Sequence, residues 1–177
     1  MSNSAGSSTS GVRRLHAVAP HQLEQLADVL VDCVEGGASV SFMLPMHRAK
    51  AVAFWQGVAD AVERGERALL VAEDAQGIVG TVQLVTAQPE NQPHRADVSK
   101  MLVHRRGRRC GLGAALMQAA EQVARDAGKS LLVLDTASGD AERLYERLGW
   151  QRCGMVPGYA LWPEGGPCDT TFFYRVL

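Results

Sequence analysis

The sequence predicts an α/β (α+β) fold in which one mixed central sheet of about seven strands carries helices on both faces. Apolar residues recur at helical spacing in some segments, β-rich runs alternate with these segments, and glycine- or proline-bearing turns separate them. A length of 177 residues suits a single domain with a sizeable core. We expect this domain to span residues 12–177, after a serine- and glycine-rich disordered tail at residues 1–11.

The first half of the chain supplies a short strand, two helices and a hairpin. Apolar residues after Pro20 recur at i, i+3, i+4 and i+7 as far as Glu35, where Gly36-Gly37 ends the predicted helix. The tight-turn signature from Asp74 to Gly77 joins two β-rich runs and predicts an antiparallel hairpin. In order, the expected elements are a strand at 12–16, helices at 20–35 and 46–64, and strands at 67–73 and 78–87.

The second half alternates strands and helices. Leu131 to Leu134 is a continuous apolar run, typical of a central strand covered on both faces. A Pro/Gly-rich excursion separates the last two strands. The expected elements are strands at 95–103, 131–134, 151–156 and 170–176, and helices at 112–128 and 140–148.

Composition excludes several classes of protein. The formal net charge is −1, which recommends neither nucleic acid nor a membrane surface as a partner. The four cysteines show neither C-x-x-C nor a Cys/His cluster, so we expect no metal site, no disulfide framework and reduced thiols in the cytoplasm. No apolar run approaches the roughly 18 residues of a membrane span.

A loop of glycine and arginine after the strand end Met101 to Val103 is the strongest functional signal. It opens the helix that begins near Leu112, and Gly111 and Gly113 leave its backbone N–H groups unobstructed. Unpaired N–H groups and the positive end of the helix dipole both favour an anion there. Arginines at 105, 106, 108 and 109 predict a strongly positive local field. We therefore expect a pyrophosphate ligand, the alternative being a glycine-rich loop flanked by incidental arginines.

Spacing separates this loop from other nucleotide sites. Neither G-x-G-x-x-G nor G-K-[ST] is present, which removes the main support for a dinucleotide or a nucleoside triphosphate. The remaining R-x-x-G-x-G pattern, Arg108, Gly111 and Gly113 after an apolar strand, resembles motif A of the GCN5-related N-acetyltransferases, the GNAT superfamily. This resemblance implies the GNAT fold and acetyl-CoA as cosubstrate.

A second signature lies downstream of the strand that ends at Asp135. Tyr145 and the pair Gly149-Trp150 fall in register with the family pattern N-x-x-A-x-x-L-Y-x-x-L-G-F, whose asparagine is Ser138 here. Arg109 replaces a usual glycine. The resemblance implies a cofactor-binding set of Met101, Leu102, Val103, Arg108, Arg109, Cys110, Gly111, Leu112, Gly113, Ala114, Ser138 and Tyr145.

Within the superfamily, short segments across most of the chain resemble the tabtoxin-resistance acetyltransferases, which acetylate the amine of a β-lactam amino-acid toxin. Among them are Gly36 to Val40 and Pro157 to Tyr159. The resemblance implies Asp97 and Asp135 as bases and Tyr145 as acid, although Asp97 stands where a longer glutamate is expected and would need a water relay.

The chemistry of amine acetylation agrees with these residue types. A protonated amine must lose a proton to a carboxylate before it attacks a thioester, and an N–H near Leu102 or Val103 could stabilise the resulting oxyanion. Alternatively, Asp135 caps the following loop, Asp97 is a solvated strand residue and Tyr145 is a core residue. Cys110 lacks a histidine partner that would make it a nucleophile.

Three functions remain open at this point. The sequence favours an acetyl-CoA-dependent N-acetyltransferase for a small amino-acid-like amine, with a role in antibiotic or toxin resistance, as a monomer or homodimer. The alternatives are a non-catalytic module that senses acetyl-CoA and an acetyltransferase for peptide or protein amines. The last would need an open groove, whereas residues 39–45 and 157–167 look able to close over the site.

Overall fold

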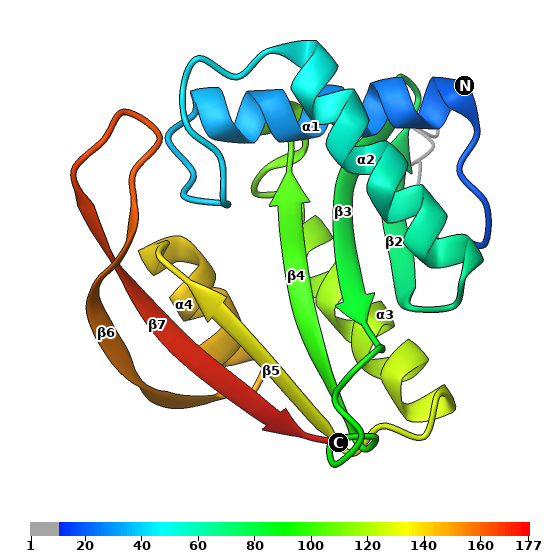
Figure 1. Ribbon diagram of the computed structural model, residues 1–177, viewed down its shortest axis with the longest axis vertical. Coiled ribbons are helices and arrows are strands. Elements are labelled where there is room, and N and C mark those ends of the chain that lie inside the picture. Colours follow the sequence, from blue (N-terminus) through cyan, green and yellow to red (C-terminus); the bar gives the residue numbers. More distant parts are fainter. Residues whose placement is uncertain (1–10) are drawn as a thin grey trace, which may run out of the picture.

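The computed structural model describes residues 11–177. All but one residue of the predicted tail, residues 1–11, lie outside the described residues. The elements, coloured along the chain in Figure 1, are β1 (Val12–Leu15), α1 (Pro20–Glu35), α2 (Arg48–Glu63), β2 (Arg67–Asp74), β3 (Gly77–Val85), β4 (Arg95–Val103), a short 3-10 helix η1 (Arg105–Gly107), α3 (Leu112–Asp126), β5 (Leu131–Thr136), α4 (Gly139–Arg147), β6 (Gln151–Leu161) and β7 (Pro167–Val176).

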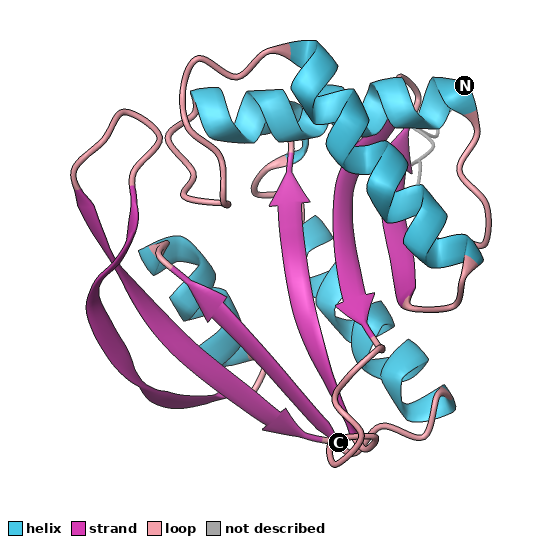
Figure 2. Ribbon diagram, in the orientation of Figure 1, coloured by secondary structure: helices cyan, strands magenta, loops and turns pink. Residues whose placement is uncertain are grey.

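The strands form one mixed sheet, in the order β1-β2-β3-β4-β5-β7-β6. All neighbouring pairs are antiparallel except β4 and β5, which run parallel. That parallel pair is short, because register pairs occur only from Arg95–Leu131 to Asp97–Val133. Beyond Asp97 the two strands diverge, as Figure 2 shows, and each continues in its own half of the sheet. The predicted mixed sheet with helices on both faces is confirmed.

Helices cover the two faces of this sheet. On one face, α1 and α2 pack over the β2–β4 half, with Leu26, Leu30 and Trp55 fully buried. On the opposite face, α3 packs behind β2–β4, and α4 lies behind β5 and β7. The second core joins Leu116 of α3 to Phe173 of β7.

Three predicted features need correction. The second helix begins at Arg48 rather than near residue 46, after the Leu44–Pro45 segment and buried Met46. Strand β5 is not covered on both faces: Leu132 and Leu134 are buried while Leu131 and Val133 are half-buried, because α1 and α2 lie over the other half of the sheet.

The Pro/Gly-rich excursion is the third correction. Most of its residues belong to the two strands, because β6 extends to Leu161 and β7 begins at Pro167. Glycines with positive φ at 154 and 158 coincide with two register shifts, so the hairpin bends instead of ending. As expected from the sequence, the four cysteines are free.

Candidate active site

The site begins where β4 separates from β5. On its other side β4 carries a bulge, because Thr81 pairs with Leu102 whereas Gln83 pairs with Ser99. Lys100, inside this bulge, has φ of +50°. A bulge re-aims side chains and bends the strand. It therefore accompanies the divergence of β4 from β5 and turns Lys100 out of the regular alternation.

The loop after β4 offers a row of free backbone donors. The first hydrogen bond of α3 runs from the Ala115 N–H to the Gly111 carbonyl at 3.1 Å. None of the described residues accepts a hydrogen bond from the N–H groups of residues 109–114. Gly111, the N-cap, has φ of +77°. No other residue lies within 4 Å of the position that a Cβ would occupy here, so the approach to these donors is open. Such a helix start binds an anion.

Gly113 has a different role from the one its spacing suggests. A Cβ at this position would lie 3.0 Å from Leu144 of α4 and would also approach Met101. The absent side chain therefore allows α3 to pack closely against α4. Gly111 is the glycine whose surroundings are open.

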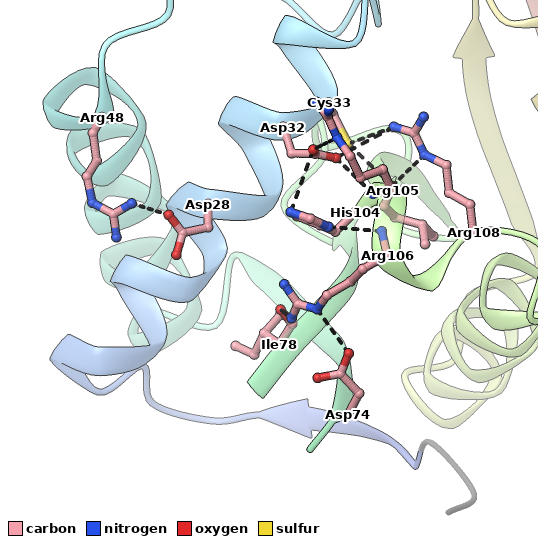
Figure 3. Close-up of polar contacts among 11 residues, drawn as sticks. Asp28, Asp32, Cys33, Arg48, Asp74, Ile78, His104, Arg105, Arg106 and Arg108 are labelled. Atoms are coloured by element: carbon pink, nitrogen blue, oxygen red, sulfur yellow. Dashed lines mark hydrogen bonds and ion pairs between the residues drawn. The ribbon is translucent and has the colours of Figure 1, made fainter. Parts of the chain in front are cut away.

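The arginines of the loop do not all face an anion site. Asp32 of α1, 7% exposed, accepts a hydrogen bond from the Arg105 backbone N–H at 2.8 Å and pairs with the Arg105 side chain. Arg108 donates to the Val103 carbonyl at 3.1 Å, with a second nitrogen 3.8 Å from Asp32. Figure 3 shows both arginines converging on the end of α1.

Arg106 points to the other side of the loop. It pairs with Asp74 at 3.0 Å and donates to the Ile78 carbonyl at 2.8 Å. The predicted strongly positive field is therefore partly neutralised by Asp32 and Asp74. No carboxylate of residues 11–177 lies within 4 Å of the Arg109 guanidinium, so its positive charge is available to a ligand.

The backbone conformation of Arg109 explains why a glycine would suit this position. Its φ is +62°, in the left-handed region that L-residues with a side chain disfavour. The three non-glycine residues with positive φ in the described chain are Ser41, Lys100 and Arg109. All three lie on the segments that form this site, where such conformations tend to collect.

Tyr145 lies on the fourth helix, as predicted. Ser138 is the N-cap of α4 and accepts a hydrogen bond from the Ala141 N–H at 3.4 Å, so the helix starts where the sequence indicates. The Tyr145 ring is 4% exposed and packs against Trp150 and Phe173, with centroids 6.0 and 5.8 Å away. Its hydroxyl has no hydrogen-bond partner among residues 11–177. Burial, and then the nearby Asp135 charge, raise the pKa of this phenol.

Asp135 stands at the end of β5, where its register partner is Phe172 of β7. Burial raises the pKa of this carboxyl; the Lys100 ammonium opposes that rise, and Asp97 adds to it. Burial lowers the pKa of Lys100, and Asp135 partly restores it. The helix that follows is capped by Ser138.

Asp97 lies at the last register pair between β4 and β5 but is already engaged. Its carboxylate accepts a hydrogen bond from Gln88 at 3.0 Å and pairs with Arg95. Gln88 and Arg95 therefore occupy the two oxygens of this carboxylate. Asp97 affects the site chiefly through its charge on Asp135.

A cavity of about 270 Å³ opens beside Asp135. The two segments predicted to close over the site form its walls and touch each other: Ser39 donates to the Leu161 carbonyl at 3.1 Å, and the Leu44 N–H donates to the Pro163 carbonyl at 2.9 Å. Its lining includes Ser39, Ser41, Phe42, Asp135, Tyr159 and Thr170.

Sequence reasoning missed Lys100, Ser41 and Asp32. Lys100 reads as an ordinary polar residue of a strand, and Asp32 as one of the charges on an amphipathic helix. A lysine directly before the apolar run Met101 to Val103 was the available signal for the first. Only long-range contacts reveal the other two.

No group of three or more His, Cys, Asp or Glu side chains within residues 11–177 could hold a metal ion. Over the same part of the chain, no helix has the length and apolar character needed to cross a membrane.

The mixed sheet divides beside a helix start that is lined by free backbone donors. The model of the "Acetyltransferase (GNAT) family" matches residues 28–150, and the chain belongs to this family.

Solved structures with the same fold agree. A ribosomal-protein-alanine N-acetyltransferase from Brucella melitensis is 21% identical over 94% of this chain and 99% of its own, with a TM-score of 0.76. A phosphinothricin acetyltransferase from Sinorhizobium meliloti, in complex with acetyl-CoA, is 17% identical over 94% and 88%, with a TM-score of 0.76. A GCN5-related N-acetyltransferase from Kribbella flavida is 20% identical over 94% and 98%, with a TM-score of 0.75.

Proposed function

We propose that this protein is an acetyl-CoA-dependent N-acetyltransferase that transfers acetyl directly to the amine of a small amino-acid-like molecule. The observation that carries the proposal is the half-open cavity of about 270 Å³ at Asp135, next to the strand divergence and walled by residues 39–45 and the β6–β7 hairpin. A cavity of this size between two segments that touch each other suits a small acceptor, whereas a peptide needs a long open groove.

The residues of the loop fit the pyrophosphate of acetyl-CoA. The unpaired N–H groups of residues 109–114 would hold the phosphates, with Arg109 as the free cation. Once bound, acetyl-CoA would supply an acetyl thioester, in which the acceptor nitrogen forms the new C–N bond and the C–S bond breaks.

Asp135 is the proposed base. Its raised pKa makes the carboxylate a stronger proton acceptor, and no described residue other than Asp135 itself, through its backbone N–H, donates a hydrogen bond to it or pairs with it within 4 Å. It would take the proton of the acceptor ammonium, directly or through one water molecule. Asp97, held by Arg95 and Gln88, supports Asp135 through its negative charge.

Tyr145 is the proposed acid. Its raised pKa keeps the phenol protonated, so it can always donate to the departing sulfur. A thiol has a reference pKa near 8.5, so a thiolate is a weaker base than tyrosinate. Proton transfer from the phenol to the thiolate is therefore uphill on its own. Asp135, which interacts with Tyr145 and carries the first proton taken from the ammonium, can reprotonate the phenol. The second proton, lost from the nitrogen as the intermediate collapses to the amide, would go to solvent, so each turnover releases one proton.

Stabilisation of the oxyanion falls to the β4 edge that faces β5. This edge loses its partner strand beyond Asp97, so N–H groups near Leu102 or Val103 on this side lack a sheet acceptor. A fixed backbone donor in a water-poor site is an effective oxyanion ligand.

The acceptor class and biological role are tested together by a thiol-release assay with acetyl-CoA. The acceptors are a β-lactam amino-acid toxin, amino acids, dipeptides, aminoglycosides and N-terminal peptides, with product masses checked for one added acetyl group. We expect turnover of amino acids and of the toxin. Turnover of peptides alone would contradict the small-acceptor proposal, and tight acetyl-CoA binding without any turnover would support a sensing module instead.

A further inference from the structure

Lys100 and Asp135 are two opposite charges that the described protein leaves unpaired. The Lys100 ammonium has three N–H donors, and Ser41 Oγ, 3.1 Å away, is its one hydrogen-bond acceptor among residues 11–177. No carboxylate of these residues lies within 4 Å of it. A half-buried ammonium without a counter-ion is costly.

The surroundings of Lys100 hold this charge near the cavity. Its ammonium lies 5.8 Å from the centroid of the Phe54 ring, which forms an edge-to-face pair with the cavity residue Phe42. The aromatic face stabilises a cation but supplies no hydrogen-bond acceptor. Two of the ammonium N–H groups therefore remain for a ligand.

Ser41 connects Lys100 to the cavity. Its hydroxyl accepts a hydrogen bond from the ammonium and lines the cavity, so its own proton is available to a bound molecule. Ser41 and Lys100 both have positive φ, at +78° and +50°. Two residues with disfavoured backbone conformations, whose side chains are hydrogen-bonded to each other, indicate a geometry held for function.

Asp135 lines the same cavity and supplies the opposite charge. The two groups are farther apart than an ion pair yet close enough for each to shift the pKa of the other. A molecule with an ammonium at one end and an anionic group at the other complements both.

We propose that Lys100 and Ser41 form the subsite for a carboxylate of the acceptor, so that the acceptor is a zwitterionic α-amino acid or a derivative that keeps its free carboxylate. The amine faces Asp135, and the carboxylate accepts hydrogen bonds from the Ser41 hydroxyl and the Lys100 ammonium. This inference rests on the proposed N-acetyltransferase function and narrows its substrate class.

The test compares L-methionine, L-phenylalanine and L-glutamine with their C-terminal carboxamides in the thiol-release assay. Amidation removes the carboxylate and also alters the basicity of the amine. The decisive quantity is therefore how the acid-to-amide ratio of kcat/KM changes from wild type to variant.

At a pH above the acidic limb of the profile, Lys100→Met should lower kcat/KM for the acids by roughly 10- to 100-fold, mainly through KM, and leave the carboxamides nearly unchanged, as expected for a charge-assisted hydrogen bond. Ser41→Ala should give a smaller loss of about 5-fold with the same selectivity. Lys50→Met is the matched control: it removes an ammonium 5.6 Å from the Phe42 ring but outside the subsite, and should change the ratio by less than about twofold. Unchanged thermal unfolding and acetyl-CoA affinity would show that the variants fold.

Equal losses for acids and carboxamides in Lys100→Met would overturn the carboxylate subsite while leaving the acetyltransferase function intact. So would wild-type turnover of amines that carry no anionic group at rates equal to those of the acids. If wild type acetylates none of these amines, the proposed function itself fails and the inference fails with it.

Discussion

Replacement of Tyr145 by phenylalanine separates a catalytic hydroxyl from a structural one. The ring is 4% exposed and packs on Trp150 and Phe173, and phenylalanine preserves these contacts. The hydroxyl has no hydrogen-bond partner among residues 11–177, so its removal breaks no bond within the described protein.

The structure sets the expected size of both effects. An unpaired hydroxyl in an apolar environment costs about 1–3 kcal/mol. The Tyr145 oxygen is not among the fully buried unpaired atoms, which reduces that cost. The free energy of unfolding should thus stay unchanged or rise by up to about 1 kcal/mol, a Tm shift of at most about 4 °C. Loss of a positioned acid should lower kcat by roughly 10²-fold or more.

Thermal unfolding and single-turnover kinetics with an acceptor identified in the thiol-release assay measure the two quantities. Tyr174→Phe is the control, because that hydroxyl bonds Gln151 on the exposed β6–β7 edge and should leave kcat unchanged. Wild-type kcat under conditions in which chemistry limits turnover would refute the assignment of Tyr145 as acid. A loss of more than 1 kcal/mol of stability would instead reveal a structural role for the hydroxyl.

Four further predictions concern the charges around the site. Asp135→Asn should lower kcat/KM by roughly 10²-fold or more. The Lys100 ammonium lowers the pKa of Asp135, so its removal in Lys100→Met should raise that pKa. The acidic limb of the kcat/KM–pH profile for a carboxamide acceptor should then move to higher pH. An unmoved limb would argue against Asp135 as base. Asp32→Asn keeps an acceptor for the Arg105 N–H but removes the negative charge. The free energy of unfolding, measured by chemical denaturation, should fall by about 1–3 kcal/mol, and the calorimetric affinity for acetyl-CoA should fall as well. Unchanged affinity would mean that the loop holds its shape without this contact. Arg109→Gly should stabilise the ligand-free protein by about 1 kcal/mol, since φ of +62° is unstrained in glycine, while weakening acetyl-CoA; a lower Tm would contradict the strain argument.

Local sequence signals located most elements well. The helix Pro20–Glu35 and the strand Arg95–Val103 have their predicted bounds, because apolar spacing and the flanking proline or glycines mark their ends directly. The β6–β7 hairpin was underestimated, because glycine and proline signal breaks in isolation and cannot reveal that bulges keep the two strands paired.

For the site, the sequence by itself determined three features: the helix start after the glycine-bearing loop, the position of Tyr145 on the helix capped by Ser138, and the placement of Asp135 at a strand end. Each depends on residues close together in the chain. Only the tertiary structure decided which charges are free. Asp32 engages Arg105 across 73 residues, and Arg95 and Gln88 occupy Asp97. Asp135 lines the cavity, and Lys100 contacts the cavity residue Ser41. The physical reason is that burial and ion pairing depend on contacts between distant segments, which no local pattern of residues specifies.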